Sequence, residues 1–345
     1  MRAVERLNLA AETIRTHLWG MSVVIEDTPT DEFQEALDYL VPEDEPIARF
    51  VHRTLAQPTS APKRNVVVHR RGEPVLATTL RARHDRWEIA TSTVAPTLRI
   101  PHRAGCLEPA LAAVGLRILI QEYFGDAMGD FGRQKLTPFD SYVARLDGFD
   151  YEDYWRSTGA LYNIRRARKK TGDIAIARDD PSTITWAIDT WEARWRDSSS
   201  GEAGAADDLR AVWPTLLKRG RLMTTGLISP QGNHVAATVD LIEGDTLVGL
   251  ITARDTEYPI AGASVGTLAI LASWDGARAA GLATVDIGSY DSYKRRLTPP
   301  GRVFYQVEIA PRLVAPRRVA RARHIAGRAK RGLRRLAAPI IGCLR

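Results

Sequence analysis

The chain has little cysteine, no long apolar run and none of the common nucleotide or metal fingerprints. Its 345 residues include two cysteines, Cys106 and Cys343, which argues against a disulfide framework and favours a reducing, cytoplasmic environment. No apolar stretch approaches the roughly 20 residues that a membrane-spanning helix needs. The seven histidines lack metal-ligand spacing, and no Walker or dinucleotide motif is present, so the sequence predicts no metal site.

The positive charge of the chain is concentrated near its C-terminal end. Residues 311–345 carry eleven Lys or Arg and no acidic residue, which leaves 37 basic and 41 acidic side chains in the first 310 residues. Between Pro316 and Pro339 the apolar residues recur every three or four positions, a pattern typical of a basic amphipathic helix. We expect this tail to be either a disordered solubilising extension or a helix that binds an anionic membrane surface or tRNA.

The two halves of the chain repeat one order of elements at a distance of about 160 residues. Gly72 and Gly232 are 160 positions apart, as are Ala77 and Ala237. Short β-rich runs bounded by turn residues predict three strands in each half: 65–70, 74–83 and 86–93, then 222–228, 234–242 and 246–252. A predicted helix follows each set, over 106–123 and 265–280, and then a strand that ends in Asp-x-Gly at Asp130 or Asp286.

This order predicts an α/β (α+β) fold with two tandem copies. In each copy an antiparallel meander, a helix and a strand parallel to the third would form a mixed, mostly antiparallel sheet flanked by helices. The helix N-terminus would then lie at the edge where the third and fourth strands end, and its unpaired N–H groups attract anions. We place the domains at 1–150, 151–310 and, for the basic tail, 311–345.

The second copy carries motifs that resemble the GNAT superfamily of acyltransferases. They are a basic helix over 163–170, the strands 223–228 and 235–241, the segment 264–268 leading to Gly281 and Asp286-Ile287-Gly288, and Tyr293-Lys294-Arg295-Arg296. More narrowly, the chain resembles the CelD-like branch, associated with cellulose and envelope polysaccharides and related to the Fem-type aminoacyl transferases, which have two GNAT domains. The resemblance covers 150–300 best and 50–140 loosely.

The resemblance implies an acyl-CoA donor whose phosphates meet the loop and first helical turn of the second copy. The matching positions are Gly262, Ser264, Val265, Gly266 and Thr267, where the glycines permit close backbone approach. The loop departs from the family pattern because it lacks the Arg or Gln that many acetyl-CoA enzymes carry there. Acyl-CoA therefore remains an expectation, and an aminoacyl-tRNA donor stays open.

The resemblance also implies that the acyl group lies in the gap between the third and fourth strands. Asp286 or Asp255 would then act as general base or orient the amine, and Tyr293 would protonate the leaving group. An Asp-x-Gly after a strand is equally typical of a turn, and Tyr293 could serve only in packing. The predicted substrate-binding residues are Tyr258, Tyr290, Lys294, Arg165 and Arg168.

The predicted function is an N-acyltransferase that moves an acyl group from acyl-CoA to an amine by direct attack. The acceptor would be an amino sugar, a lipid-linked or other cell-envelope precursor, or a small metabolite. The alternatives are aminoacyl transfer from charged tRNA, as in the Fem-type relatives, and a non-catalytic scaffold. The first copy has fewer polar residues at the matching places. This predicts that it is a degenerate lobe that forms one wall of the acceptor cleft. We expect the protein in the cytoplasm, with the tail as a potential attachment to the inner face of the membrane.

Overall fold

The computed structural model of the protein describes most of the chain before residue 311. The described ranges are 13–18, 20–83, 86–123, 127–131, 136–170, 173–195, 205–258, 264–289 and 293–310. Residues up to Ala310 form one unit of packing. The predicted basic tail, 311–345, lies outside the described residues.

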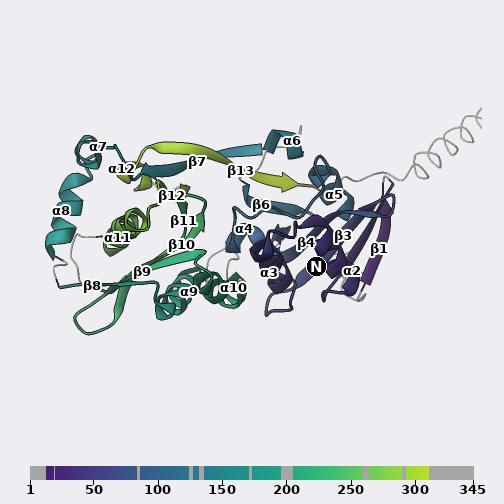
Figure 1. Ribbon diagram of the computed structural model, residues 1–345, viewed down its shortest axis with the longest axis horizontal. Coiled ribbons are helices and arrows are strands. Elements are labelled where there is room, and N and C mark those ends of the chain that lie inside the picture. Colours follow the sequence, from purple (N-terminus) through teal and green to yellow (C-terminus); the bar gives the residue numbers. More distant parts are fainter. Residues whose placement is uncertain are drawn as a thin grey trace, which may run out of the picture. The chain divides into compact units, whose positions relative to one another are not determined.

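The described strands form one mixed sheet of thirteen strands (Figure 1). Their bounds are β1 Thr13–Leu18, β2 Met21–Glu26, β3 Lys63–Arg70, β4 Glu73–Arg83, β5 Arg86–Ile89, β6 Ile118–Tyr123, β7 Leu136–Arg145, β8 Ala175–Arg178, β9 Leu222–Ile228, β10 His234–Glu243, β11 Thr246–Arg254, β12 Thr284–Ser289 and β13 Pro300–Ile309. Their order across the sheet is β1-β2-β3-β4-β5-β6-β13-β7-β12-β11-β10-β9-β8. The β5–β6 and β11–β12 pairs are parallel, and the other described pairs are antiparallel.

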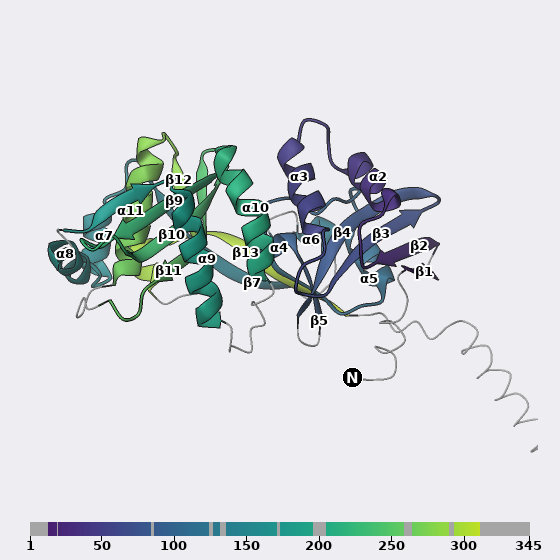
Figure 2. The ribbon, with the colours of Figure 1, turned by 90° about the horizontal axis from the view of Figure 1, so that it is seen from below.

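Helices cover both faces of this sheet (Figure 2). Their bounds are α2 Asp31–Leu40, α3 Pro46–Leu55, α4 Thr91–Val94, α5 Leu107–Val114, α6 Ala127–Phe131, α7 Tyr151–Ser157, α8 Leu161–Lys170, α9 Pro181–Trp195, α10 Ala206–Lys218, α11 Val265–Ala279 and α12 Lys294–Leu297. Alternation along the strands separates the cores on the two faces. Val66 and Val68 pack with α5, whereas Val67, between them, packs with α2.

Five of the six predicted meander strands are confirmed with small shifts at their ends, whereas the strand predicted over 86–93 ends at Ile89 because Thr91–Val94 forms α4. β9 has the predicted bounds, and β10 and β11 extend one and two residues further. The turns between strands place Gly72 and Gly232 at φ values of 86° and 84°. This left-handed backbone region favours glycine, so the matched glycines are turn residues in both copies.

The predicted helix over 106–123 is wrong for its second half. The helix α5 ends at Val114 because Gly115 takes a φ of 75°, the left-handed conformation that stops many helices. Ile118–Tyr123 then forms β6, parallel to β5, with Ile118 and Ile120 buried in the same core as α5. The segment with Asp130 lies in α6, so β6, not a strand ending at Asp130, corresponds to β12.

Each half gives its last strand to the other half of the sheet. β7, from the first half, pairs with β12, whereas β13, from the second half, pairs with β6. β7 and β13 also pair with each other from Pro300↔Tyr142 to Val307↔Leu136. A Leu-Thr-Pro motif opens β7 and directly precedes β13. The two copies therefore share one sheet through exchanged strands, and the domain boundary at residue 150 stays a prediction.

Within the described ranges, no helix is both long and apolar enough to cross a bilayer.

Candidate active site

The strands β11 and β12 separate after a short parallel pairing. They pair at Thr246↔Thr284, Leu247↔Val285 and Val248↔Asp286, and the next residue of β11 is Gly249. A methyl group on Gly249 would lie 3.3 Å from the carbonyl oxygen of Asp286 and 3.5 Å from Oδ1 of Asp240. A side chain at position 249 would therefore crowd the point where the strands separate.

A β-bulge adds to this separation. In the β10–β11 ladder, Val239 pairs with Ile251 but Asp240 pairs with Gly249, which leaves Leu250 as an extra residue on β11. Such a bulge bends its strand and changes the direction of the side chains that follow. β11 consequently leaves β12 and opens a space above α11.

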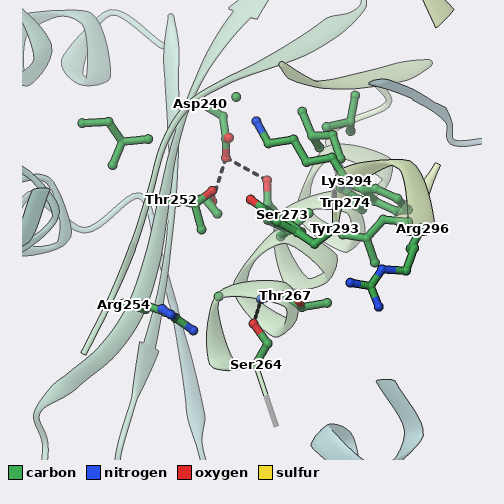
Figure 3. Close-up of a pocket in the computed structure, with 18 of the residues that line it drawn as sticks. Asp240, Thr252, Arg254, Ser264, Thr267, Ser273, Trp274, Tyr293, Lys294 and Arg296 are labelled. Carbon is green, nitrogen blue, oxygen red and sulfur yellow. Dashed lines mark hydrogen bonds between the residues drawn. The ribbon is translucent and has the colours of Figure 1, made fainter. Parts of the chain in front are cut away.

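A cavity of about 750 Å³ fills this space (Figure 3). Its walls come from β10, β11, β12, α8, α11 and α12, with Trp191 of α9 at one side. Its polar lining includes Asp240, Thr252, Ser264, Thr267, Ser273 and Tyr293. The volume is in the range of small-molecule sites.

Among the described residues that line this cavity, Asp240 is the one with a carboxyl side chain. It is 4% exposed, and the hydroxyls of Thr238 and Ser273 both donate hydrogen bonds to its Oδ2 at 2.8 Å. Its Oδ1 lies on the side of Gly249. Burial raises the pKa of Asp240 from 3.8 to about 7, although the two hydrogen bonds lower it. Asp240 can therefore gain or lose a proton near neutral pH.

Four cationic side chains also line the cavity: Arg194, Arg254, Lys294 and Arg296. Arg254 lies at the N-terminus of α11, where a methyl group on Gly266 would be 3.9 Å from its Cδ. Lys294 lies near the separated strands, because a methyl group on Gly288 would be 3.5 Å from its Nζ. This charge favours ligands with phosphate or carboxylate groups.

The structure brings part of the predicted donor loop to the cavity. Ser264, Gly266 and Thr267 line it, and the Oγ of Ser264 caps α11 by accepting a hydrogen bond from the N–H of Thr267 at 3.3 Å. Val265 is buried in the core beside α11 and does not line the cavity. Gly262 lies outside the described residues.

The structure places the predicted catalytic residues in different environments. Tyr293 lines the cavity, together with the predicted substrate-binding residue Lys294, whereas Asp286 points to the opposite face of the sheet from its neighbours Val285 and Ile287. Asp286 is 1% exposed, its Oδ2 is 2.6 Å from Nε of Arg302, and it accepts hydrogen bonds from Ser141 and from the N–H of Gly288. These are the contacts of a structural carboxylate.

The remaining predicted residues lie away from the cavity wall or outside the described ranges. The side chain of Asp255 accepts a hydrogen bond from the N–H of Glu257 at 2.8 Å, as in a turn, and Tyr258 packs against the core beside α11. Neither is among the cavity-lining residues. Tyr290 is not described.

Arg165 and Arg168 do not line the cavity either. Arg165 is exposed and pairs with Glu152 at 3.0 Å, and the guanidinium of Arg168 lies 6.0 Å from the ring centre of Trp155. A surface cavity of about 610 Å³ lies on this side of α8. Its lining includes Arg156, Tyr162, Arg165, Arg166 and Lys169.

Sequence reasoning missed Asp240 and Arg254. Aspartate is depleted in strands, and Asp240 lies between the apolar residues Val239 and Leu241 of a predicted strand. This unusual position could have identified it as a candidate site residue. Arg254 ends β11 and supplies a guanidinium beside the donor loop, where the family pattern would place an Arg or Gln within the loop itself. No group of three or more His, Cys, Asp or Glu side chains with the arrangement of a metal site occurs among the residues described.

Comparison with known proteins places the second copy in a family. Residues 159–295 match the family described as "Acetyltransferase (GNAT) domain". No curated protein matches the sequence significantly. Three solved structures with similar folds are L-PGS from Bacillus licheniformis, a tandem GNAT protein from the clavulanic acid biosynthesis pathway, and FemX.

The similarity to these structures is distant. L-PGS has 12% identity and a TM-score of 0.48, with 86% of this chain and 96% of that chain covered. The tandem GNAT protein has 14% identity and a TM-score of 0.46, with 84% and 99% covered. FemX has 12% identity and a TM-score of 0.41, with 85% and 96% covered. The family match identifies residues 159–295 as an acetyltransferase (GNAT) domain, and the first half of the chain repeats its order of meander, helix and parallel strand.

Proposed function

We propose that the protein transfers an acyl group from acyl-CoA to an amine, with Asp240 as the proton acceptor. The observation that carries the proposal is the position of Asp240, a buried carboxyl at the floor of the cavity where β11 and β12 separate. The acceptor would be an amino sugar, a lipid-linked or other cell-envelope precursor, or a small metabolite. Fold alone does not fix this chemistry, so the proposal rests on the site.

Starting from an ammonium, the reaction removes two protons from the nitrogen and supplies one to the leaving sulfur. The ammonium of the acceptor loses a proton to the Asp240 carboxylate, and the free amine attacks the acyl carbonyl carbon. The C–N bond forms and the C–S bond breaks. The leaving thiolate takes a proton from the hydroxyl of Tyr293, and the second proton that the attacking nitrogen loses on forming the amide returns to the Tyr293 oxygen. No covalent enzyme intermediate is required. Asp255 and Asp286 stay predictions as bases, without contacts to the cavity that support them.

The donor phosphates would lie at the first turn of α11. The N–H groups of the turn that follows Ser264 favour an anion there, and the guanidinium of Arg254 lies beside Gly266. Arg254 would thus replace the arginine that the loop lacks. Lys294, near the separated strands, would contact the reacting end of the donor or an anionic acceptor.

A second candidate donor is aminoacyl-tRNA. The observation that favours it is the outer side of α8, where Arg165, Arg166 and Lys169 are exposed together with Tyr162, which is 71% exposed. Cations with an exposed aromatic ring are suited to nucleic acid. A role of the 311–345 tail at a membrane surface, and the matching cellular location, are further proposals about residues that the structure does not describe.

Thermal melting with acetyl-CoA, longer acyl-CoAs and free CoA tests the donor. A ligand at 100 times its Kd stabilises the fold by about 2.7 kcal/mol, which is an easily measured rise in Tm. We expect acyl-CoA to raise Tm and Arg254→Gln to lose most of that rise. Arg145→Gln is the control, because the side chain of Arg145 is 71% exposed on β7.

The outcomes separate the candidate functions. No rise with any CoA species would overturn the acyl-CoA proposal. Binding of charged tRNA that weakens steeply with salt would then support the alternative. A scaffold predicts that the cellular role survives Asp240→Asn.

A further inference from the structure

A second cavity, of about 590 Å³, opens in the first half of the chain. The parallel strands β5 and β6 pair at Trp87↔Ile118 and Glu88↔Leu119, and the next residue of each strand, Ile89 and Ile120, lines this cavity. The cavity therefore occupies in the first copy the place that the active-site cavity occupies at the β11–β12 separation in the second. A lobe that served only as a wall would be expected to fill this space with apolar side chains.

The cavity holds an ordered polar cluster instead. His102 is 5% exposed, its Nδ1 is 2.6 Å from the carbonyl oxygen of Ile100, and its Nε2 is 3.3 Å from Oδ1 of Asp130. The hydroxyl of Tyr123 donates a hydrogen bond to the other oxygen of Asp130. Both ring nitrogens of His102 therefore have an oxygen within hydrogen-bond distance, and these contacts hold the ring in place.

The second half of the chain contributes charged groups to the same cavity. Arg302 of β13 lines it, and the 2.6 Å contact between its Nε and Asp286 fixes the position of its guanidinium. Glu243, at the end of β10, also lines it, and burial raises the pKa of that carboxyl. Asp286 thus contacts a residue that lines this second cavity.

A second arginine of this cavity belongs to the loop between α4 and α5. Arg99 lines the cavity, and its guanidinium donates a hydrogen bond to the carbonyl oxygen of His102 at 3.2 Å. Among the described lining residues, the cations are Arg99 and Arg302, the acids are Asp130 and Glu243, and His102 adds an imidazole ring. A ligand with charge of one sign would meet groups of its own sign, whereas a ligand with both signs can satisfy both sets.

We propose that this cavity is a second ligand site that binds a small zwitterion of the α-amino-acid type. The ligand's carboxylate would pair with guanidinium groups of Arg99 or Arg302, which suit planar anions. Its ammonium would meet the carboxylates of Asp130 or Glu243. The site is separate from the donor cavity, so it goes beyond the proposed acyl transfer and does not depend on it.

The test is thermal melting and calorimetric titration of the full chain with the twenty free L-amino acids. For each amino acid that binds, the matched acid and the matched amine are also titrated, for example propionate and ethylamine for L-alanine. We expect at least one amino acid to raise Tm saturably, while its acid and its amine do not. Arg99→Gln and Glu243→Gln should each weaken that binding at least tenfold. Asp147→Asn, at a 78% exposed side chain, should not change it.

Three results would overturn the proposal. The first is that no amino acid gives a saturable rise in Tm. The second is a rise that both Arg99→Gln and Glu243→Gln retain, or that the acid alone reproduces. The third is a rise that Arg254→Gln removes and Arg99→Gln keeps, because the ligand would then occupy the active-site cavity. The Tm rise with acyl-CoA is measured on the same variants, so a failure of the acyl-transfer proposal is seen separately.

Discussion

Asp240 combines two properties that a general base at neutral pH needs. It lies where the reacting groups would meet, and burial brings its pKa to about 7. Below that pH it is a neutral acid whose Oδ2 accepts from Thr238 and Ser273, and above it a carboxylate that keeps both hydrogen bonds. A base with a pKa near the working pH is present in its reactive form and still binds the proton that it removes.

We predict that Asp240→Asn lowers kcat/KM by about 10²- to 10⁴-fold, the usual contribution of a general base. In the wild type, kcat/KM should rise with pH and level off above about 7, because the carboxylate is the active form. The variant should lose this rise. Asp275→Asn is the control, since Asp275 is exposed on the same helix as Ser273. A variant that retains the wild-type pH profile would contradict the assignment.

The same pKa predicts a change in stability with pH. The folded-state pKa of Asp240 is above the unfolded value of 3.8, so the native state holds the proton more tightly. The stabilising contribution is complete below about pH 4 and is lost as the pH rises through about 7. The free energy of unfolding of the wild type, relative to Asp240→Asn, should therefore fall over that range in urea titrations.

At the scale of single elements, we expect the cap of α11 to have both a structural and a binding role. Ser264 caps α11 with its Oγ, as Thr30 caps α2 by accepting from the N–H of Phe33 at 3.4 Å. We predict that Ser264→Ala and Thr30→Ala each lower the free energy of unfolding by about 1 kcal/mol. Only Ser264→Ala should also raise the KM for acyl-CoA. Equal effects of both variants on KM would show that Ser264 acts through stability alone.

The elements also show how far local sequence could predict the fold. The meander strands were predictable because turn residues such as Gly72 and Gly232 mark their ends. The helix–strand break at Gly115 was not found, because the apolar run Ile118-Leu119-Ile120 fits a helix and a buried strand equally well. Asp240 was not predicted as a site residue because the burial of its side chain depends on α11, which packs on β10 from a distant part of the sequence. The strand exchange depends on pairing partners that local pattern does not specify.

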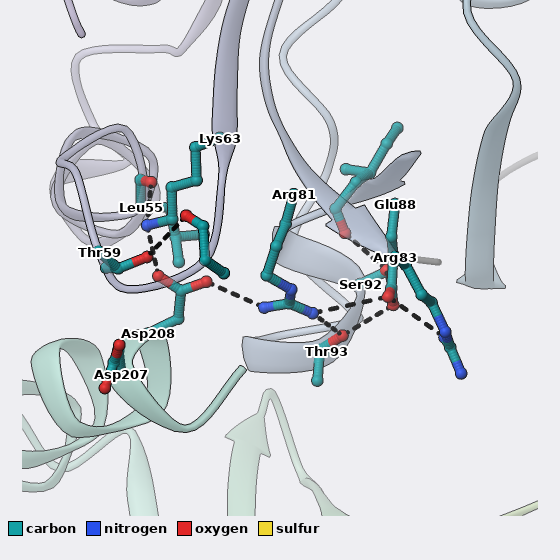
Figure 4. A network of polar contacts seen from close by, with 12 residues as sticks. Leu55, Thr59, Lys63, Arg81, Arg83, Glu88, Ser92, Thr93, Asp207 and Asp208 are labelled. Carbon is teal, nitrogen blue, oxygen red and sulfur yellow. Dashed lines mark hydrogen bonds and ion pairs between the residues drawn. The ribbon is translucent and has the colours of Figure 1, made fainter. Parts of the chain in front are cut away.

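At the scale of the whole molecule, exchanged strands and a buried ion network join the two halves. Asp208 of α10 pairs with Lys63 at 2.5 Å and with Arg81 at 2.9 Å, and all three side chains are at most 3% exposed (Figure 4). Lys63 and Arg81 belong to β3 and β4 of the first half, so the network crosses between the copies. Nζ of Lys63 also donates to the carbonyls of Leu55 and Gln57. Strands, core and charges are thus shared, and we expect the halves to unfold together.

The last prediction tests this coupling with two adjacent residues of α10. Asp208→Ala removes the carboxylate that Lys63 and Arg81 share, although Arg81 keeps Glu88 at 3.6 Å. Removing one partner of a buried pair costs about 3–5 kcal/mol. Asp207, whose side chain is 35% exposed and bonds Ser60, provides the control, and Asp207→Ala should cost at most about 1 kcal/mol. Urea unfolding followed by fluorescence and by circular dichroism should give one transition for the wild type and the same single transition, at lower urea, for Asp208→Ala. Two separated transitions in the wild type, or equal losses for the two variants, would show that the halves are stabilised independently, because a network shared by both copies must affect both when it is broken.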